Sequence, residues 1–374
     1  MGNQSRFRTC LHQLQETGEI ADFILGRQDI LSQFQIPDRL YGRSAEVETL
    51  LTTFKRVRQG SCEMMLVKGY SGIGKSCLVP EISQQIAREG GYFITGKFDY
   101  FQGKMPYSAV VRAFQELVRQ LLTQTQAVLN RWKEKLLAAL GPDGQVIIDV
   151  IPEVELIVGQ QPPVQSLARG SSENRFNLVL SSFIRAFGSR EHPLVIFLDD
   201  LQWADGATLK LIELILTPGA GQYLFLIGAY PDNEVSANHP LAIALKAIRW
   251  SGAIVNHVTL SPLGPEHITQ LIADSLHRDA QTVKPLAELV RRKTNGNPFF
   301  VHQFLRLLYS ENLLTFNQPQ SEGSPGKWQW DYAKIEAKSI TDNVIDLTIA
   351  KLQQLPAGRG RLYAWQLAWA INSI

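Results

Sequence analysis

The sequence predicts an α/β protein with a parallel sheet flanked by helices, followed by a smaller all-helical subdomain. From Gly264 to about Leu314 the apolar residues have helical spacing throughout, which predicts the second unit. Before that point, strand-like apolar runs alternate with helical segments, and this alternation favours a parallel sheet covered on both faces. The five runs are residues 63–69, 92–99, 193–200, 222–230 and 253–260.

The first elements can be placed one by one. Residues 7–35 have a helical and then an extended pattern, which ends before Pro37 because proline excludes its predecessor from the α region. A helix is expected between residues 40 and 57, where Val47, Leu50, Leu51 and Phe54 recur at helical spacing. A second helix is expected from about Ser76 to Ala87, and a long helical insert from Tyr107 to about Leu140.

The C-terminal part has the pattern of a hairpin. Residues 313–317 and 327–331 are expected to pair as strands around a flexible loop at 321–327. The chain is thereby divided into four segments. They are an N-terminal helical and extended linker (1–36), the sheet domain (37–262), the helical subdomain with its hairpin (263–356) and an atypical tail (357–374).

Composition and charge narrow the class of protein. The 374 residues are 45% hydrophobic and 19% charged, as in globular chains of two or three domains. Lys plus Arg number 37 against 35 Asp plus Glu, so the net charge of +2 gives no reason to expect nucleic acid or anionic lipid as a partner. The three cysteines lack CxxC spacing, no apolar run has the length of a membrane span, and the start MGNQSRFR is not a signal peptide. We therefore expect a cytoplasmic protein without membrane contact.

Residues 69 to 76 read GYSGIGKS, a phosphate-binding pattern placed between a buried strand and a helix. The glycines let backbone N–H groups point into the loop, and the helix adds its positive end. Lys75 is expected to reach the β- and γ-phosphates of ATP, and the Ser76 hydroxyl to bind Mg²⁺. A glycine-rich turn without a ligand would not explain Lys75 and Ser76 at this spacing. The predicted nucleotide-binding residues of the loop are Gly69, Tyr70, Ser71, Gly72, Ile73, Gly74, Lys75 and Ser76.

Two carboxylates end the apolar run LVIFLDD. A carboxylate at the end of a neighbouring buried strand completes a nucleotide site, and the fold class becomes a P-loop NTPase followed by an all-helical lid subdomain. We expect Asp199 to hold Mg²⁺ through water and Asp200 to orient or deprotonate the attacking water. Without the phosphate loop, an acidic turn after a core strand would be the simpler interpretation. Many P-loop ATPases carry Glu at the second position, so the shorter Asp200 predicts slow turnover.

Several longer segments are similar to one family. They include LYGRSAEVETLL, MMLVKGYSGIGKSCLV, NRFNLV, EHPLVIFLDDLQWADGATLKLI, LFLIGAYPDNEV and KTNGNPFFVHQFL. Over about residues 23–356 the chain resembles the AAA-type ATPase module of large bacterial signalling proteins, a signal-transduction ATPase with numerous domains (STAND). There the module lies between a serine/threonine kinase and GAF and sensor histidine kinase domains. The resemblance implies a nucleotide-controlled conformational switch that works with kinase or histidine kinase domains, and it leaves a homo-oligomer open.

The resemblance also implies roles for residues that the pattern alone places in loops. Gly42 and Arg43 match a motif that lies near the nucleotide base, and Gly296-Asn297-Pro298 match a motif of the helical subdomain that contacts the nucleotide from above. Two departures stand out: Ser44 replaces the usual acid, and Pro231 replaces an arginine that would sense the γ-phosphate. Proline has neither charge nor N–H, so we expect weak discrimination between ATP and ADP and very slow hydrolysis.

Parts of the sequence also fit other classes of protein. Transcription regulators of the same ATPase class bind DNA, but the basic patches at 131–135 and 289–297 alternate with apolar or acidic residues, as solvated helix faces do. His277-Arg278-Asp279 spells part of a kinase catalytic loop, yet the required Asn is replaced by Lys284 and no DFG follows. The tail after Pro356 departs from the family and leaves Trp365 and Trp369 uncovered. A gene fragment that binds nucleotide without useful turnover is therefore a further alternative.

Overall fold

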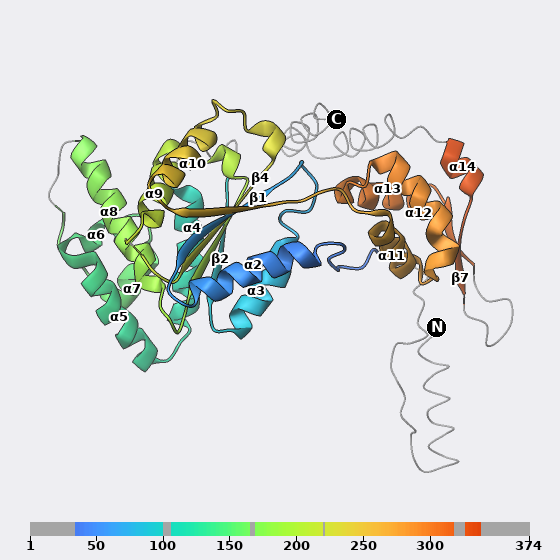
Figure 1. The fold of residues 1–374 in the computed structure, drawn as a ribbon. Helices are drawn as coiled ribbons and strands as arrows, with labels where there is room; N and C mark the ends of the chain where they lie inside the picture. Colours follow the sequence, from blue (N-terminus) through green and yellow to red (C-terminus); the bar gives the residue numbers. More distant parts are fainter. Residues whose placement is uncertain (1–33, 100–105, 165–168, 220, 318–325, 338–374) are drawn as a thin grey trace, which may run out of the picture.

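The computed structural model describes residues 34–99, 106–164, 169–219, 221–317 and 326–337 (Figure 1). The predictions for most of the N-terminal linker, for most of the 321–327 loop and for the tail with Trp365 and Trp369 lie outside the described residues. Among the described residues, no helix combines the length and the apolar character needed to cross a membrane.

A parallel sheet of five strands forms the centre of the molecule, in the order β2-β3-β4-β1-β5. The predicted fold class is confirmed, because all five apolar runs are strands of this sheet. One expectation was wrong: the strand that ends in the two aspartates is not paired with the strand before the phosphate loop, since β4 lies between them. The strands are β1 (Cys62–Lys68), β2 (Tyr92–Lys97), β3 (Leu194–Asp199), β4 (Leu224–Tyr230) and β5 (Ile254–Thr259).

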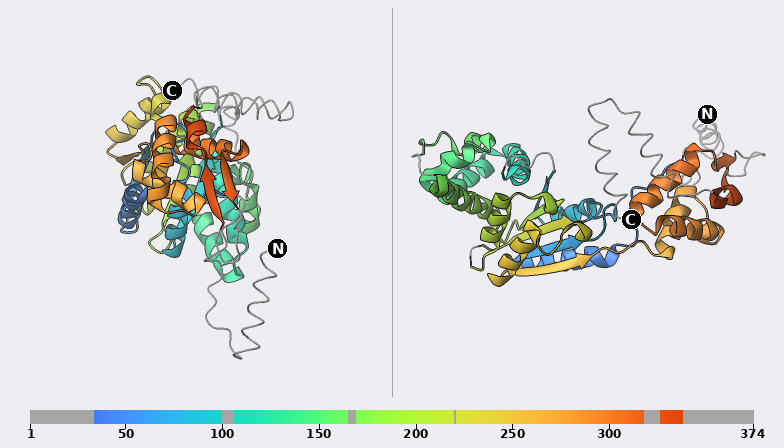
Figure 2. Two further views of the ribbon diagram at one scale, coloured as in Figure 1. Left: turned by 90° about the vertical axis from the view of Figure 1, so that its right-hand side faces the viewer. Right: turned by 90° about the horizontal axis from the view of Figure 1, so that it is seen from above.

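Helices cover both faces of the sheet (Figures 1 and 2). Alternate residues of the strands point to opposite faces, so that Met65 and Val67 pack with α2 and α3 while Met64 and Leu66 pack with the helices on the other face. The first layer is α2 (Ser44–Val57) and α3 (Leu78–Arg88). The second layer is α4 (Ser108–Leu122), α5 (Gln126–Leu140), α6 (Gly144–Ile148), α7 (Glu155–Val158), α8 (Arg169–Phe187), α9 (Gly206–Leu216) and α10 (Pro240–Trp250).

The predicted helical insert at 107–140 is two helices, α4 and α5. The chain leaves α4 at Thr123, whose Oγ1 donates a hydrogen bond to the Gln120 carbonyl at 2.8 Å, and Thr125 is extended before α5 begins. Threonine hydroxyls compete in this way with the helical hydrogen bonds of the backbone. A helical periodicity on both sides of the break concealed it in the sequence.

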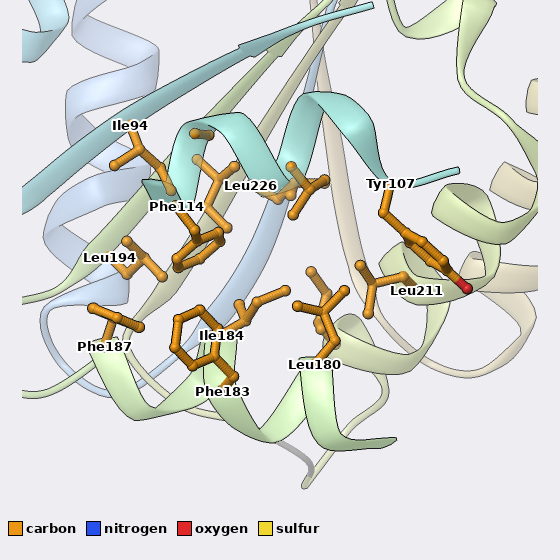
Figure 3. Close-up of a cluster of buried hydrophobic side chains, with 14 of the residues drawn as sticks. Ile94, Tyr107, Phe114, Leu180, Phe183, Ile184, Phe187, Leu194, Leu211 and Leu226 are labelled. Carbon is orange, nitrogen blue, oxygen red and sulfur yellow. The ribbon is translucent and has the colours of Figure 1, made fainter. Parts of the chain in front are cut away.

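An aromatic cluster fixes α4 and α8 to the sheet (Figure 3). The ring of Phe114 lies 5.5 Å from that of Phe183 and 5.3 Å from that of Phe187, and all three rings are buried. They pack under Leu194 and Leu226, which belong to β3 and β4. Buried aromatic groups of this size contribute strongly to packing. The strands that carry the site therefore pack on a buried aromatic layer.

The second unit has its own hydrophobic cluster and lies at one end of the molecule, away from α5–α8 (Figures 1 and 2). The predicted hairpin is confirmed, with Phe316 opposite Trp328 and the Trp328 ring buried. Phe34 packs in the same cluster, and the Tyr41 hydroxyl donates to Asp274 Oδ2 at 2.8 Å. The elements are α11 (Pro265–Leu276), α12 (Ala280–Thr294), α13 (Pro298–Ser310), β6 (Leu314–Asn317), β7 (Lys327–Trp330) and α14 (Tyr332–Ala337).

The His277-Arg278-Asp279 segment is a turn between α11 and α12. His277 ends α11 in the left-handed conformation, and Asp279 begins α12 by accepting a hydrogen bond from the Thr282 N–H at 2.9 Å. These are the positions of a helix end and a helix N-cap. The segment thus ends one helix and begins the next, at a point where the sequence had predicted helical spacing throughout.

Candidate nucleotide-binding site

The loop after β1 has the conformation of a phosphate cradle. Gly69, Gly72 and Gly74 have φ values of 141°, 76° and 97°, which favour glycine. A Cβ atom on Gly69 would lie 2.7 Å from the Leu260 carbonyl oxygen, so the close packing on the loop after β5 also requires glycine there. The chain then turns through i→i+3 hydrogen bonds and α3 begins at Leu78, slightly later than predicted.

Lys75 folds back into this loop. Its Nζ donates hydrogen bonds to the carbonyl oxygens of Gly69 at 2.8 Å and Tyr70 at 3.0 Å, and the residue is 8% exposed. Burial lowers the pKa of the Lys75 ammonium, and the carboxylates Asp200 and Asp199 oppose that shift. The ammonium is therefore held at the centre of the loop, where phosphate oxygens could replace the two carbonyls as acceptors.

The side chains of Ser76 and Asp199 are in contact, although β4 lies between β1, which precedes the loop of Ser76, and β3, which ends in Asp199. The Ser76 Oγ donates to Asp199 Oδ2 at 2.6 Å. A hydroxyl and a carboxylate are oxygen donors of the kind that Mg²⁺ prefers, so the predicted pair fits this ion. In the part of the chain that the structure describes, no group of three or more His, Cys, Asp or Glu side chains could hold a metal. Two protein oxygens leave room for the phosphate oxygens and water molecules that usually complete the shell of Mg²⁺.

Lys97 is a cation of the site that the sequence did not reveal. Its Nζ lies 3.1 Å from Asp200 Oδ2 and 3.7 Å from Asp199 Oδ2. Burial, and then the charge of Asp199, raises the pKa of the Asp200 carboxyl, while Lys97 opposes the rise. Lys97 ends β2 opposite Asp199 in the register, which only the strand order places there. Asp200 itself is in the left-handed conformation with φ 55°.

Gln202 and Glu234 are the other polar groups that sequence reasoning missed. Gln202 Nε2 contacts Asp200 Oδ1 at 3.4 Å, and the same side chain hydrogen-bonds to the Glu234 carboxyl. Burial raises the pKa of Glu234 to about 7, an effect that Asp200 strengthens and Lys75 opposes. The available signal was weak: Glu234 lies four residues beyond the end of β4, and only the position of β4 between β1 and β3 brings it to the site.

Arg43 connects the phosphate loop to the chain after β5. Its Nη2 donates to the Ile73 carbonyl at 3.1 Å and to the Ser261 carbonyl at 2.7 Å, and the residue is 4% exposed. Gly42 has φ 62°, and a Cβ there would come within 2.6 Å of the His267 ring of the lid. The two residues thus lie where loop, sheet and lid meet. Their contact with a nucleotide base remains a prediction.

The lid motif Gly296-Asn297-Pro298 contacts the phosphate loop directly. Asn297 Nδ2 donates to the Ser71 carbonyl at 3.0 Å, and the Phe299 N–H donates to the Gly72 carbonyl at 3.2 Å. Asn297 Oδ1 also accepts from the Phe299 N–H at 3.0 Å, which caps α13. Both acceptor oxygens belong to the phosphate loop, so the lid and the loop are hydrogen-bonded as one unit.

Residues 39–227 match the family model described as "AAA ATPase domain", which is half of the chain. The chain therefore belongs to the AAA ATPase domain family. Membership defines it as a nucleotide-binding ATPase module, and the matched segment includes the phosphate loop, Asp199 and Asp200.

The chain is similar to segments of three long curated proteins. "Hybrid signal transduction histidine kinase G" of Dictyostelium discoideum is 31% identical over 400 residues, which cover 90% of this chain and 11% of that protein. The "Peroxide stress-activated histidine kinases" mak2 and mak3 of Schizosaccharomyces pombe are 23% and 20% identical, covering 72% and 86% of this chain and 12% and 17% of theirs. The chain thus spans less than a fifth of each relative. Both organisms are eukaryotes, so these relatives do not test the bacterial setting that the resemblance implied.

Two solved structures align with most of the chain at low sequence identity. The Aeropyrum pernix ORC1 protein in complex with DNA has a TM-score of 0.42 and 16% identity, covering 86% of this chain and 70% of that one. Cdc6p from Pyrobaculum aerophilum has a TM-score of 0.43 and 12% identity, covering 91% and 86%. The fold class rests on the sheet order and the phosphate loop described above.

Proposed function

We propose that the chain binds Mg-ATP at the phosphate loop and acts as a slow, nucleotide-controlled conformational switch in a kinase signalling protein. The observation that carries this proposal is the pair of hydrogen bonds from the lid to the carbonyls of Ser71 and Gly72. Phosphates bound by the loop would fix those carbonyls, and the lid would be held with them. Shifting a minor closed state to dominance takes about 5.5 kcal/mol of differential affinity.

The residues of the phosphate loop and of β3 would have different roles in binding Mg-ATP. The loop amides and Lys75 would bind the phosphates, Lys75 exchanging its carbonyl partners for phosphate oxygens. Ser76 and Asp199 would hold Mg²⁺, which neutralises phosphate charge when bound. Asp200 would stand beside the attacking water, and Gly42, Arg43 and the Gly296-Asn297-Pro298 motif would surround the base and close the site.

Slow turnover fits two features of this chain. The Asp200 Oδ2 is paired with Lys97 at 3.1 Å, and this cation makes the carboxylate a weaker acceptor for a proton from water. Pro231 directly follows β4, at a position where the family carries an arginine, and proline offers no charge to a γ-phosphate. ATP would then serve mainly to stabilise a conformation.

The output of the switch would pass through the chain around the module. Phe34 precedes the P-loop domain (37–262) and Tyr41 lies near its start, yet both pack against the lid (263–356). A moving lid would therefore pull on the segment that leads into the domain. The named relatives are histidine kinases, which supports kinase domains as partners, while the cytoplasmic location rests on the sequence alone.

Hydrogen exchange with and without Mg-ATP tests the proposal. ATP should slow exchange in the first turn of α13 and around Tyr41. Asn297→Ser keeps a cap for α13 and removes the donor to Ser71, so it should weaken the lid response by about fivefold while the phosphate loop remains protected. Asn130→Ser on α5 is the matched control and should change nothing. Lid exchange that does not respond to bound ATP would overturn the switch.

A further inference from the structure

Glu234 lies on a loop that emerges between the two halves of the site. β4 runs between β1 and β3, with Lys68 opposite Tyr230 and Leu198 opposite Gly228. The chain after β4, a short 3₁₀ turn at Asp232–Glu234, therefore leaves the sheet between the phosphate loop and the two aspartates. Lys75 is close enough to Glu234 to act on its charge.

Two buried oxygen atoms at this point have no hydrogen-bond partner within the described residues. They are Gln202 Oε1 and Glu234 Oε2. Gln202 is 7% exposed, and its amide nitrogen faces Asp200 and Glu234, so its oxygen is fixed by those contacts. Buried polar groups in native proteins are nearly always paired, and the exceptions are enriched where a ligand or water binds.

The chemistry of the two atoms indicates what they bind. An amide oxygen and a carboxylate oxygen accept hydrogen bonds and donate none. Phosphate oxygens would be repelled, whereas one water molecule could donate a hydrogen to each. Its lone pairs would then point away from both acceptors and be free to attack.

Asp200 is less suited to take the proton. Its Oδ2 pairs with Lys97 at 3.1 Å and its Oδ1 accepts from Gln202 at 3.4 Å, so both oxygens are engaged. No ion pair of Glu234 occurs among the described residues. The groups that face Glu234 are Lys75, Asp200 and Gln202. Burial raises its pKa to about 7, close to the value that suits a general base at neutral pH.

We propose that Glu234 is a catalytic residue, the proton acceptor for the hydrolytic water, and that Gln202 positions this water. The inference rests on the proposed function. The water oxygen forms a bond to the γ-phosphorus, the bond from that phosphorus to the bridging oxygen breaks, and its electron pair leaves with ADP. One proton of the water passes to Glu234 Oε2 and is later released to solvent.

A binding measurement tests the position of Glu234 without turnover. ATP in excess EDTA is titrated calorimetrically at about pH 8 in two buffers of different ionisation enthalpy, which gives the protons taken up on binding. Phosphate charge beside Glu234 should raise its pKa further and cause proton uptake in the wild type. Glu234→Gln should lose this uptake, and Asp232→Asn, which removes an equal charge from the same turn, should retain it.

Hydrolysis measured from about pH 5 to pH 9 tests the role. Glu234→Gln should lower kcat about a hundredfold and abolish its acidic limb, with ATP affinity within about threefold, while Asp232→Asn keeps the wild-type profile. Gln202→Leu should lower kcat and keep the decrease of kcat at acidic pH. Bound ATP with no hydrolysis in the wild type, or an unchanged limb in Glu234→Gln, would overturn this inference alone. Failure of the wild type to bind ATP would overturn the proposed function as well.

Discussion

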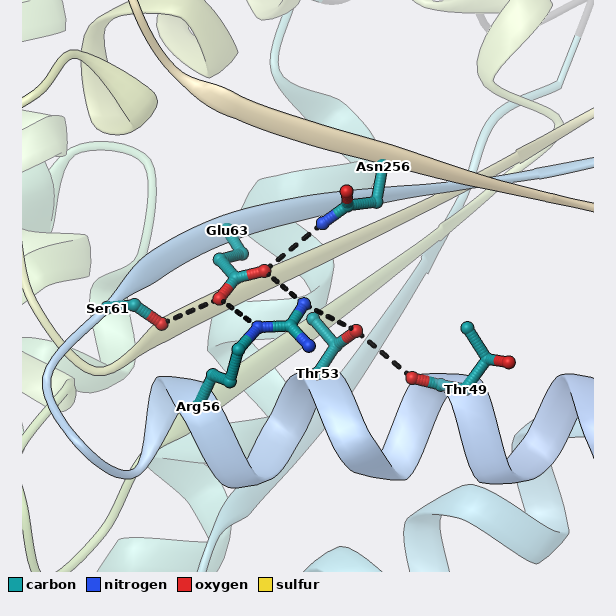
Figure 4. Close-up of polar contacts among 6 residues, drawn as sticks. All are labelled: Thr49, Thr53, Arg56, Ser61, Glu63 and Asn256. Atoms are coloured by element: carbon teal, nitrogen blue, oxygen red, sulfur yellow. Dashed lines mark hydrogen bonds and ion pairs between the residues drawn. The ribbon is translucent and has the colours of Figure 1, made fainter.

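Carboxylates lie near both ends of β1, and the hydrogen-bonding partners of their oxygen atoms differ between the two ends. At the amino end, Glu63 is 2% exposed and accepts four hydrogen bonds (Figure 4). Arg56 donates from Nε at 2.9 Å and from Nη2 at 2.6 Å, Ser61 Oγ at 2.9 Å and Asn256 Nδ2 at 3.2 Å. Each of the two carboxylate oxygens of Glu63 therefore accepts two hydrogen bonds.

At the carboxyl end the polar groups are only partly satisfied. Gln202 Oε1 and Glu234 Oε2 have no partner among the described residues, and burial raises the pKa of Asp200 and Glu234. The amino end also has a hollow, of about 630 Å³, lined by Arg56, Glu63 and Asn256 among others. A hollow with a satisfied network is structural, whereas unsatisfied groups beside a phosphate loop indicate chemistry.

Removal of the Glu63 carboxylate, at the amino end of β1, should have the largest effect on the stability of the fold. Glu63→Ala leaves the guanidinium of Arg56 and the amide of Asn256 without their acceptor, and should lower the free energy of unfolding by about 2–4 kcal/mol. Urea denaturation measures this change. Glu48→Ala, an exposed position on α2, is the control. A loss below about 0.5 kcal/mol would show that the network is not needed.

A positive charge added near the carboxyl end of β1 should change the preference for ATP over ADP. Pro231→Arg places a cation at the end of β4, and a charge-assisted contact to the γ-phosphate is worth about 1.5–3 kcal/mol. The ratio of ATP to ADP affinity should therefore rise by about tenfold or more. Pro231→Ala separates this effect from the loss of proline. A wild type that already prefers ATP strongly would mean that another residue senses the γ-phosphate.

The smallest expected effect is a gain of stability on replacing Glu234, near the carboxyl end of β1. The folded-state pKa of Glu234, about 7, exceeds the usual 4.5, so its stabilising contribution is present below about pH 4.5 and is lost as the pH rises through 7. The loss is at most about 3 kcal/mol and, after solvent screening, on the order of 1 kcal/mol. Glu234→Gln should thus stabilise the ligand-free protein at about pH 8 and have little effect near pH 4. Urea melts at both pH values check this, and equal stability at both would contradict it.

The same comparison shows what the sequence could predict. The strands, the phosphate loop and the hairpin carry local signals, and Ser76 and Asp199 follow from motifs; the structure brings these two within 2.6 Å. Lys97, Gln202 and Glu234 belong to the site because of the strand order β2-β3-β4-β1-β5. Strand order depends on contacts between distant segments, and nothing in the local pattern encodes it.

The partners of Arg43 could not be predicted for the same reason. The family motif implies a place near the nucleotide base, which stays a prediction, and the structure shows that the guanidinium donates to the carbonyls of Ile73 and Ser261. A motif identifies a residue, whereas its partners come from segments that are 30 and 218 residues away. Side-chain partners across such separations require the fold.

Calorimetric titration of Mg-ATP into the wild type and Lys75→Ala tests the central claim, that the carboxyl end of β1 is the nucleotide site. Lys75 supplies the cation at the centre of the loop, so its loss should weaken binding by about a hundredfold or more. Lys210→Ala, an exposed lysine on α9, should bind as the wild type does, and circular dichroism should show both variants folded. Equal affinity of Lys75→Ala and the wild type for Mg-ATP would contradict the assignment of the site.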